Sequence, residues 1–222
     1  MFTDISADVV EQLFDSVWEG KLSQVKNLLQ QGVPVDSFNQ ESNSCLLQEA
    51  IYQSLGAVGW DSQSNHATYL KIMDCLLENG ADPNRRVKAR MNTAKYTTYI
   101  NELISNDDCY FPEKELDILV THGASVNMQD SNGHTPLHKA LSRLSSNRLI
   151  PVERCVLLNV VEWLLDTTAD PYVTDYNGIS SVEYANRLLK KKVLSDREKI
   201  QLSNLFDREG YFGFDKLVLK VA

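Results

Sequence analysis

The residues of this chain best suited to acid–base or metal chemistry are its four histidines, His66, His122, His134 and His138. Asp61 lies five residues before His66, and Asp130 lies four residues before His134. Each pair could place an imidazole beside a carboxylate, which is the beginning of a general-base site. A single imidazole in a polar loop is ordinarily solvated, and a solvated histidine is the simpler interpretation of both pairs.

The chain shows none of the sequence motifs that mark common active sites. It has no phosphate-binding glycine loop, no HExxH pair, no nucleophile elbow and no cluster with metal-ligand spacing. Asp107 and Asp108 are adjacent, and adjacent carboxylates point to different sides, which makes a poor cation site. We therefore expect no enzyme activity, no catalytic residue, no cofactor and no bound metal.

The segments that must position these residues recur at a nearly constant interval. Gly32, Gly80, Gly123, Thr168 and Gly210 each follow an apolar stretch typical of a helix end, at intervals of 48, 43, 45 and 42 residues. A period of this size indicates stacked repeats that share one core. Glycine after a helix adopts the left-handed conformation at little cost, so Thr168 at the same place is expected to strain its turn.

The stretch "NGHTPLHKAL" (residues 132–141) resembles the ankyrin consensus, and "NGISSVEYAN" (177–186) repeats it in register. Residues 20–32 are similar to the second ankyrin helix. The resemblance implies an all-α ankyrin-repeat solenoid of about five helix pairs, formed as a single domain by residues 1–222. The expected repeats are residues 8–36, 37–84, 85–127, 128–172 and 173–210, with residues 211–222 as a C-terminal cap.

The best-matched repeat also gives expectations for single residues. Thr135 can cap a helix that begins at Pro136, where the missing proline N–H would be unpaired in any case. Leu137 lies on the face of that helix expected to be buried. The resemblance implies that His138 hydrogen-bonds between adjacent loops.

Every interval exceeds the usual ankyrin period of about 33 residues, and the extra residues lie between the two helices of repeats two to five. Part of the excess is expected as longer helix pairs in repeats two and four, including a helix that begins at Pro151. The remainder is expected as loops over residues 56–68, 105–113 and 145–153. Their apolar residues could pack over the helix ends or form a ridge that binds a partner. The candidates on that ridge are Trp60, Tyr110 and Phe111.

Residues 85–99 form a second unusual segment, with five basic residues and no acidic one: Arg85, Arg86, Lys88, Arg90 and Lys95. A solvated charged loop is one interpretation. The other is a basic clamp for a carboxylate-rich or phosphorylated partner, because guanidinium groups bind such groups through two hydrogen bonds.

Composition and cysteine use restrict the class of protein. The 222 residues carry a net charge of −8, which disfavours nucleic-acid binding because the phosphates would be repelled. Four cysteines are scattered, and Cys75 and Cys155 fall in apolar helix stripes, which predicts buried free thiols in a reducing compartment. No 18-residue apolar run and no secretion signal are present, so we expect a cytoplasmic protein without a membrane segment.

These patterns predict a protein–protein interaction module that is monomeric on its own. One specific role is a stoichiometric inhibitor, like the immunity proteins that neutralise a toxin. The alternatives are a secreted bacterial effector or an ankyrin adaptor, and a self-associating structural protein. The resemblance implies binding through the concave surface, whose candidate residues are Arg85, Arg86, Arg90, Met128, Asp130, His134, Thr174, Asp175 and Tyr176.

Overall fold

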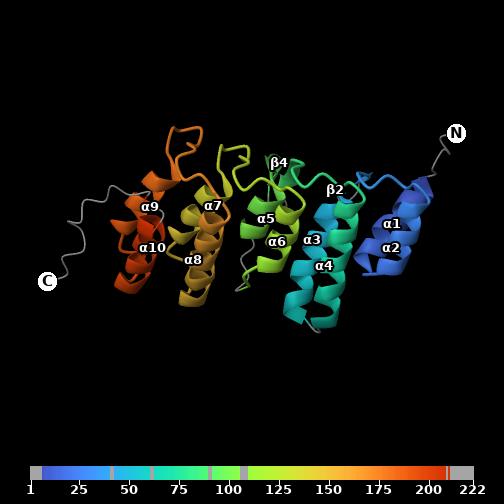
Figure 1. Ribbon diagram of the computed structural model, residues 1–222, viewed down its shortest axis with the longest axis horizontal. Helices are drawn as coiled ribbons and strands as arrows, with labels where there is room; N and C mark the ends of the chain where they lie inside the picture. The colour runs from blue at the N-terminus through green and yellow to red at the C-terminus, as the bar shows by residue number, and fades with distance from the viewer. Residues whose placement is uncertain are drawn as a thin grey trace. The chain divides into compact units, whose positions relative to one another are not determined.

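The computed structural model describes residues 7–40, 43–60, 63–89, 92–105, 110–208 and 210, without the side chains of residues 59, 60, 63, 64 and 92–94. The chain divides into two compact units. Unit 1 contains residues 1–103 and 112–125, and unit 2 contains residues 104–111 and 126–222. Both consist of helices whose connecting loops project from one end (Figure 1).

Most helices of unit 1 pack against helices one or two places away in the chain. The first helix packs against the second and third, the third against the fourth, and the fourth against the sixth. Leu13, Val25, Leu46, Leu76 and Leu116 are fully buried and form its core. The helices are α1 (Ala7–Trp18), α2 (Leu22–Gln30), α3 (Leu46–Trp60), α4 (Gln63–Glu78), α5 (Tyr99–Ser105), which ends in unit 2, and α6 (Glu113–Thr121).

Two short hairpins connect the helices of unit 1. Strand β1 (Phe38–Asn39) pairs with β2 (Ser44–Cys45), and β3 (Val87–Ala89) pairs with β4 (Asn92–Thr97), both antiparallel. The register of the second hairpin shifts between Lys88 and Ala89. The basic segment is therefore folded as a β-hairpin rather than as an irregular charged loop.

Unit 2 contains α7 (Pro136–Leu144), α8 (Pro151–Asp166), α9 (Ser181–Leu189) and α10 (Asp196–Arg208). Helix α7 packs against α8 and α9, and α10 packs against α8 and α9. Leu137, Leu141, Leu164, Ala185 and Leu202 are fully buried between them. In the described residues of both units the predicted all-α arrangement of helix pairs is confirmed, and strands are short and few.

The predicted helix boundaries of the best-matched repeat are confirmed. Thr135 caps α7, Pro136 is its first residue, and Pro151 is the first residue of α8. The turn after α8 places Thr168 at a φ of 68°, in the left-handed region that Gly80 and Gly123 occupy after α4 and α6. Thr168 is thus a β-branched residue in a conformation that favours glycine.

An asparagine joins consecutive helix-end turns in each unit. In unit 1, Asn84 donates to the carbonyl of Gly123 (2.9 Å) and accepts from the N–H of Ser125 (2.7 Å). In unit 2, Asn127 accepts from the N–H of Asp170 (2.8 Å). The side-chain amide thereby pairs backbone groups in the loop that follows α6 or α8.

The expected loop at residues 56–68 is wrong. Helix α3 continues to Trp60 and α4 begins at Gln63, so most of this insert extends a closely packed helix pair. Helix packing overrides the glycine, serine and asparagine residues that favour a loop here. In repeat four, only α8 is long, with 16 residues against 9 in α7.

The beginning of α8 also differs from expectation. Its buried residues start at Leu157, whereas Val152 is 54% exposed and Cys155 is exposed. The first turns of this helix therefore extend beyond the core, and the predicted burial of Cys155 is wrong. Cys45 and Cys75 are buried free thiols.

The single-domain organisation and the repeat boundaries stay predictions, and the expected cap at residues 211–222 lies outside the described residues. Within the described part of the chain, none of the helices is both long and apolar enough to cross a bilayer.

Candidate protein-binding surface

Two loops of unit 2, the first finger (residues 127–135) and the second finger (170–180), are closed by the same hydrogen bonds. Asp130 Oδ1 accepts from the N–H groups of Asn132 (2.7 Å) and His134 (3.0 Å). Asp175 Oδ1, 45 residues later, accepts from those of Asn177 (2.8 Å) and Ile179 (3.0 Å). Each buried carboxylate satisfies two backbone donors of a tight turn, which fixes the finger.

The Asp175 carboxylate is stabilised in its ionised form. Burial acts to raise its pKa, but the N–H groups of Ile179 and Asn177 and the hydroxyl of Tyr184 donate to the charged form and hold the pKa at about 2. The Tyr184 hydroxyl lies 3.1 Å from Asp175 Oδ2. A charge therefore lies beneath the second finger over the physiological pH range.

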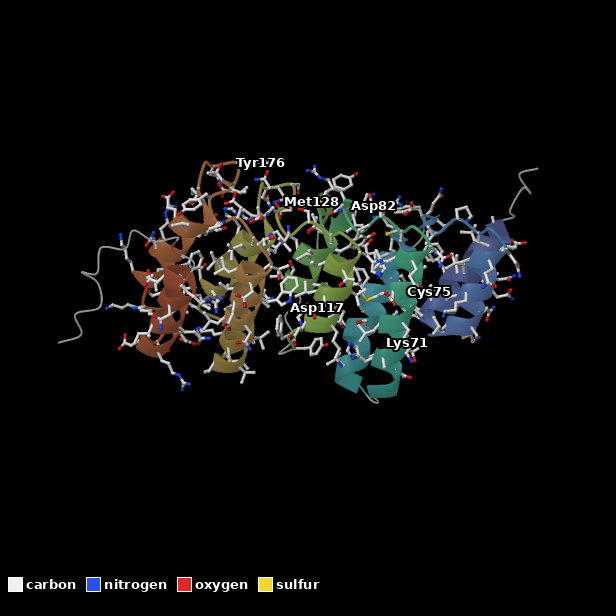
Figure 2. The ribbon with its side chains drawn as sticks, viewed as in Figure 1. Lys71, Cys75, Asp82, Asp117, Met128 and Tyr176 are labelled. Carbon is white, nitrogen blue, oxygen red and sulfur yellow. The ribbon has the colours of Figure 1, made fainter. Side chains whose placement is uncertain are left out.

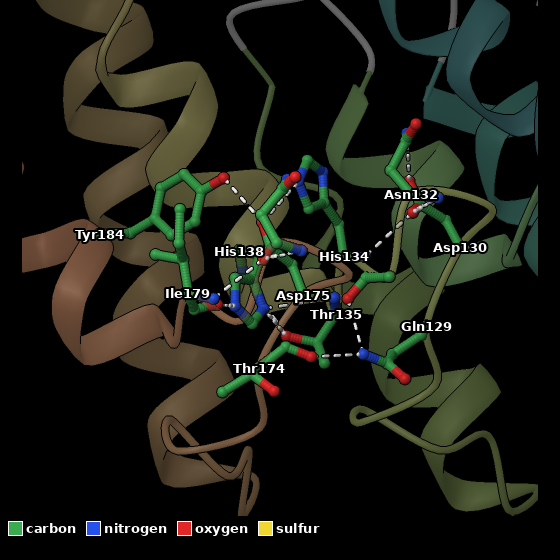
Figure 3. A network of polar contacts seen from close by, with 12 residues as sticks. Gln129, Asp130, Asn132, His134, Thr135, His138, Thr174, Asp175, Ile179 and Tyr184 are labelled. Carbon is green, nitrogen blue, oxygen red and sulfur yellow. Dashed lines mark hydrogen bonds and ion pairs between the residues drawn. The ribbon is translucent and has the colours of Figure 1, made fainter.

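His138 connects the two fingers, as the resemblance implied. Its Nδ1 contacts Thr135 Oγ1 (2.8 Å) at the start of α7, and its Nε2 donates to the carbonyl of Ile179 (3.0 Å) in the second finger. Burial lowers the pKa of His138, and the hydrogen bond to Ile179 offsets only part of that effect. Burial therefore favours the neutral imidazole. Figure 3 shows the polar contacts around His138.

Two aromatic rings, those of His134 and Tyr184, contact the ring of His138. The ring of His134 is stacked on that of His138, with 5.9 Å between centroids, and Tyr184 meets both rings edge to face. His134 Nε2 lies 3.6 Å from Asp175 Oδ2. The imidazole of His134 thus approaches the carboxylate of the second finger, while its backbone N–H bonds Asp130 of its own finger.

The fingers also contact each other at their tips. The Gln129 side chain donates to the carbonyls of Gly133 (2.7 Å) and Thr174 (2.8 Å). Gly133 has a φ of 77°, and a Cβ added there would lie 2.6 Å from the backbone nitrogen and the ring of Tyr176. Glycine is needed here so that Tyr176 can pack on the first finger.

Tyr176 remains the most prominent side chain of the pair. It is 67% exposed although its ring packs on Gly133, and Figure 2 shows it on the projecting loop between α8 and α9. Of the other predicted residues in unit 2, Thr174 is exposed and Met128 and His134 are half-buried. Asp130 and Asp175 are buried and hold the fingers, so their expected direct contact with a partner is not available in this conformation.

The three predicted residues of unit 1 have different environments. Arg85 is paired with Asp36 (3.3 Å), an acidic residue outside the basic segment. Arg86 is exposed. Arg90 lies outside the described residues.

The alternative ridge is only partly described. The side chain of Trp60 lies outside the described residues, and Tyr110 and Phe111 are half-buried. Ile150 and Val152, by contrast, are each more than half exposed at the start of α8.

Comparison with known proteins identifies the repeats. Family models described as "Ankyrin repeats (many copies)" and "Ankyrin repeat" match residues 108–150 and 132–176. The matched segments are ankyrin repeats. It is 31% identical over 117 residues to a protein named as an ankyrin repeat protein of Fowlpox virus (strain NVSL). The match covers 53% of this chain and 28% of that protein. Ankyrin repeats are protein–protein interaction modules, and this chain is one.

The ankyrin repeats of unit 1 contain a polar cluster that sequence reasoning missed. Glu115 of α6 is fully buried, its Oε1 lies 2.8 Å from His66 Nε2 of α4, and Ser54 of α3 donates to the same oxygen. The expected solvated loop position of His66 is therefore wrong. A signal did exist: Glu115 precedes Leu116 and Leu119 on the inward stripe of its helix, and a carboxylate there needs partners.

The cluster ties three helices together and does not have the order of a nucleophile–base pair. Serine and imidazole both contact one carboxylate oxygen, whereas a triad requires the serine to donate to the imidazole. In the described part of the chain, no three histidine, cysteine, aspartate or glutamate side chains gather as a metal site would require.

Proposed function

We propose that this ankyrin-repeat protein is a stoichiometric inhibitor that covers a functional surface of another protein, as an immunity protein does with its toxin. It acts without chemistry of its own, as a monomer in the cytoplasm. The contact is made by the tips of the two fingers of unit 2. An adaptor or a secreted effector would use the same surface, and the experiments below separate these roles.

The observation that carries the proposal is the placement of Tyr176. The Tyr176 side chain is two-thirds exposed, and its ring packs on Gly133. It stands on a finger whose backbone is fixed by Asp175. An ordered exposed tyrosine loses little conformational freedom on binding and offers apolar area together with a hydroxyl. Such residues dominate the binding energy of protein interfaces.

The experiment compares Tyr176→Ala with a matched exposed control, Val152→Ala, at the far end of α8. A partner captured with the wild-type chain is purified, and its affinity for each variant is measured by calorimetry. Tyr176→Ala should weaken binding by about 2 kcal/mol or more, and Val152→Ala by less than about 0.5 kcal/mol. The reverse result would place the interface on the opposite end of the helices.

The inhibitory role has its own test with the same purified partner. Titration of the partner with this chain should abolish the partner's activity at one equivalent, and light scattering should give a monomer for the free chain. Unchanged partner activity with recruitment of a second protein would indicate an adaptor. Self-association at micromolar concentration would indicate the structural alternative.

A further inference from the structure

The β3–β4 hairpin of unit 1 has an inward and an outward side. Val87 and Thr97 are a cross-strand pair, and both are buried. The next pair, Lys88 and Tyr96, therefore points to the opposite side, because successive residues of a strand alternate. Tyr96 is 51% exposed. Arg86, two residues before Lys88, is exposed as well.

The hairpin is held firmly on the unit. Gln48 of α3 donates to the carbonyl of Lys88 (3.0 Å), and the Lys88 ammonium donates to Asn43 Oδ1 (2.9 Å) on the preceding loop. Cys45, at the end of β2, contacts the hydroxyl of Tyr99 (2.9 Å) at the start of α5. The outward side of the hairpin is therefore a fixed surface. Binding of a ligand there would immobilise few further groups of the protein, so little conformational entropy would be lost.

The charge of this surface is opposite to that of the protein as a whole. The chain carries −8, yet Lys88 is bonded to a neutral amide, and Arg86 forms no ion pair with any residue that the structure describes. Asp36, a carboxylate on the adjoining loop, is already paired with Arg85. The two cations thus keep their charge available beside an exposed aromatic ring.

We propose that Arg86, Lys88 and Tyr96 form a docking surface for an acidic segment of the partner protein. Aspartate or glutamate side chains of that segment bind Arg86 and Lys88, and an adjacent apolar side chain packs on Tyr96. This inference rests on the proposed function and adds the chemical class of the partner. Nucleic acid is a poorer ligand, because its phosphates would also meet the net negative charge of the chain.

The first experiment identifies the ligand class directly. A displayed library of random peptides is selected against the full-length chain, and the enriched peptides are sequenced. Enrichment of acidic peptides with an aromatic or aliphatic residue is the expected result. Enrichment of neutral or basic peptides, or no enrichment, would overturn the proposal.

The second experiment assigns the peptide to the hairpin. The double reversal Arg86→Glu/Lys88→Glu is compared with Lys190→Glu/Lys191→Glu, which reverses two exposed lysines of unit 2 and changes the net charge equally. The hairpin variant should weaken binding of an acidic peptide about tenfold or more and reduce its salt dependence, and the control should stay within about twofold. Equal losses in both variants would show a general charge effect and refute the docking surface.

Two further variants guard against a folding artefact, because Lys88 also bonds Asn43. Arg86→Glu alone and Tyr96→Ala leave that bond in place, and each should weaken the acidic peptide at an unchanged melting temperature. A phosphorylated peptide or a single-stranded oligonucleotide of equal charge should bind more weakly than the acidic peptide. If either binds as tightly, the surface is a general anion site and the proposal is wrong.

The outcome can be separated from that of the proposed function. If the purified partner loses affinity with Tyr176→Ala but not with the hairpin reversal, the fingers of unit 2 bind it and the acidic-segment inference fails. If the hairpin variants alone weaken binding, the inference stands and the placement of the interface on unit 2 fails.

Discussion

The fingers of unit 2 and the hairpins of unit 1 occupy corresponding places in their repeats but are stabilised by different means. In unit 2, Asp130 and Asp175 each accept two backbone N–H groups at a buried oxygen. In unit 1, cross-strand pairing does this task, and Arg85 and Lys88 bond to the preceding loop. The backbone N–H groups of a tight turn need acceptors. One carboxylate can accept these hydrogen bonds where a loop has no strand pairing to do so.

The difference has consequences for the surface. The fingers use Asp130 and Asp175 internally, and the second finger presents the uncharged ring of Tyr176. The outward side of the β3–β4 hairpin instead presents cations and a tyrosine. The interiors differ in the same sense, since unit 1 buries Ser54 and Glu115, with His66 half-buried beside them, whereas the residues that α8 buries in unit 2 are all aliphatic.

The largest expected effect tests the polar interior of unit 1. Glu115→Ala should lower the free energy of unfolding by about 3–5 kcal/mol, because it removes the shared acceptor of a buried charged cluster. Glu113→Ala, at an exposed position of the same helix, should cost less than about 0.5 kcal/mol. Chemical denaturation measures both. Similar small losses would mean that the cluster does not hold α3, α4 and α6 together.

The matching test in unit 2 concerns its apolar interior. Leu137→Ala should lower the free energy of unfolding by about 2–5 kcal/mol, as expected for a fully buried leucine. The exposed Val152→Ala is the control in the same denaturation experiment. A loss below about 0.5 kcal/mol for Leu137→Ala would contradict the assigned packing of α7.

The buried finger carboxylate of Asp175 should contribute more to the free energy of unfolding than the exposed carboxylate of Asp36 in unit 1. Asp175→Asn should cost about 1–3 kcal/mol, because it weakens hydrogen bonds to two backbone donors of the second finger. Asp36→Asn, which removes only the exposed pairing with Arg85, should cost less than about 1 kcal/mol. Thermal unfolding measures both losses. Equal losses in the two variants would contradict the view that a buried carboxylate stabilises the finger more than an exposed ion pair stabilises the hairpin loop.

Acid should act on the finger network in two steps. The pKa of His138 is lowered by burial, so its contribution to stability is complete above about pH 6.5 and declines below it as the unfolded chain takes up the proton. The pKa of Asp175 is about 2, so its contribution is complete above about pH 4 and is lost as the pH approaches 2. Melting temperatures across this range should show both declines, and Asp175→Asn should retain only the first.

The smallest effect concerns the turns that both units share. Thr168→Gly should raise the free energy of unfolding by about 1 kcal/mol, because threonine is strained at a φ of 68°. Gly123→Ala at the corresponding turn of unit 1 should lower it by about 1 kcal/mol. A clear loss with Thr168→Gly would show that its turn depends on the threonine side chain.

The fold was predictable where the sequence keeps the ankyrin pattern. Thr135, Pro136 and His138 have the predicted roles, since each acts within a few residues or at a fixed repeat distance. Thr168 was recognised by position alone, because the left-handed turn follows the helix whatever residue occupies it. These are local requirements of the backbone, so local sequence is enough to show them.

The candidate site was harder to predict because burial depends on tertiary packing. Asp175 looked like a surface residue of a polar loop, but its carboxylate is turned inward by two N–H groups of its own turn. The hairpin did have a signal, in the threonine and tyrosine residues of "TAKYTTY" at residues 93–99. The contact of His66 with Glu115 joins positions 49 residues apart, and no single-sequence pattern specifies such a pair.

The repetition of the finger bonds has a consequence for how the length of this protein can change. Asp130 and Asp175 begin equivalent turns 45 residues apart, so excision of residues 130–174 joins Gln129 to a turn with the same backbone bonding. Duplication of that cassette is equally compatible with the turns on either side. Recombination between the two copies can thus add or remove a whole repeat without inventing a new loop. The number of repeats can then change without any change in the residues at the finger tips.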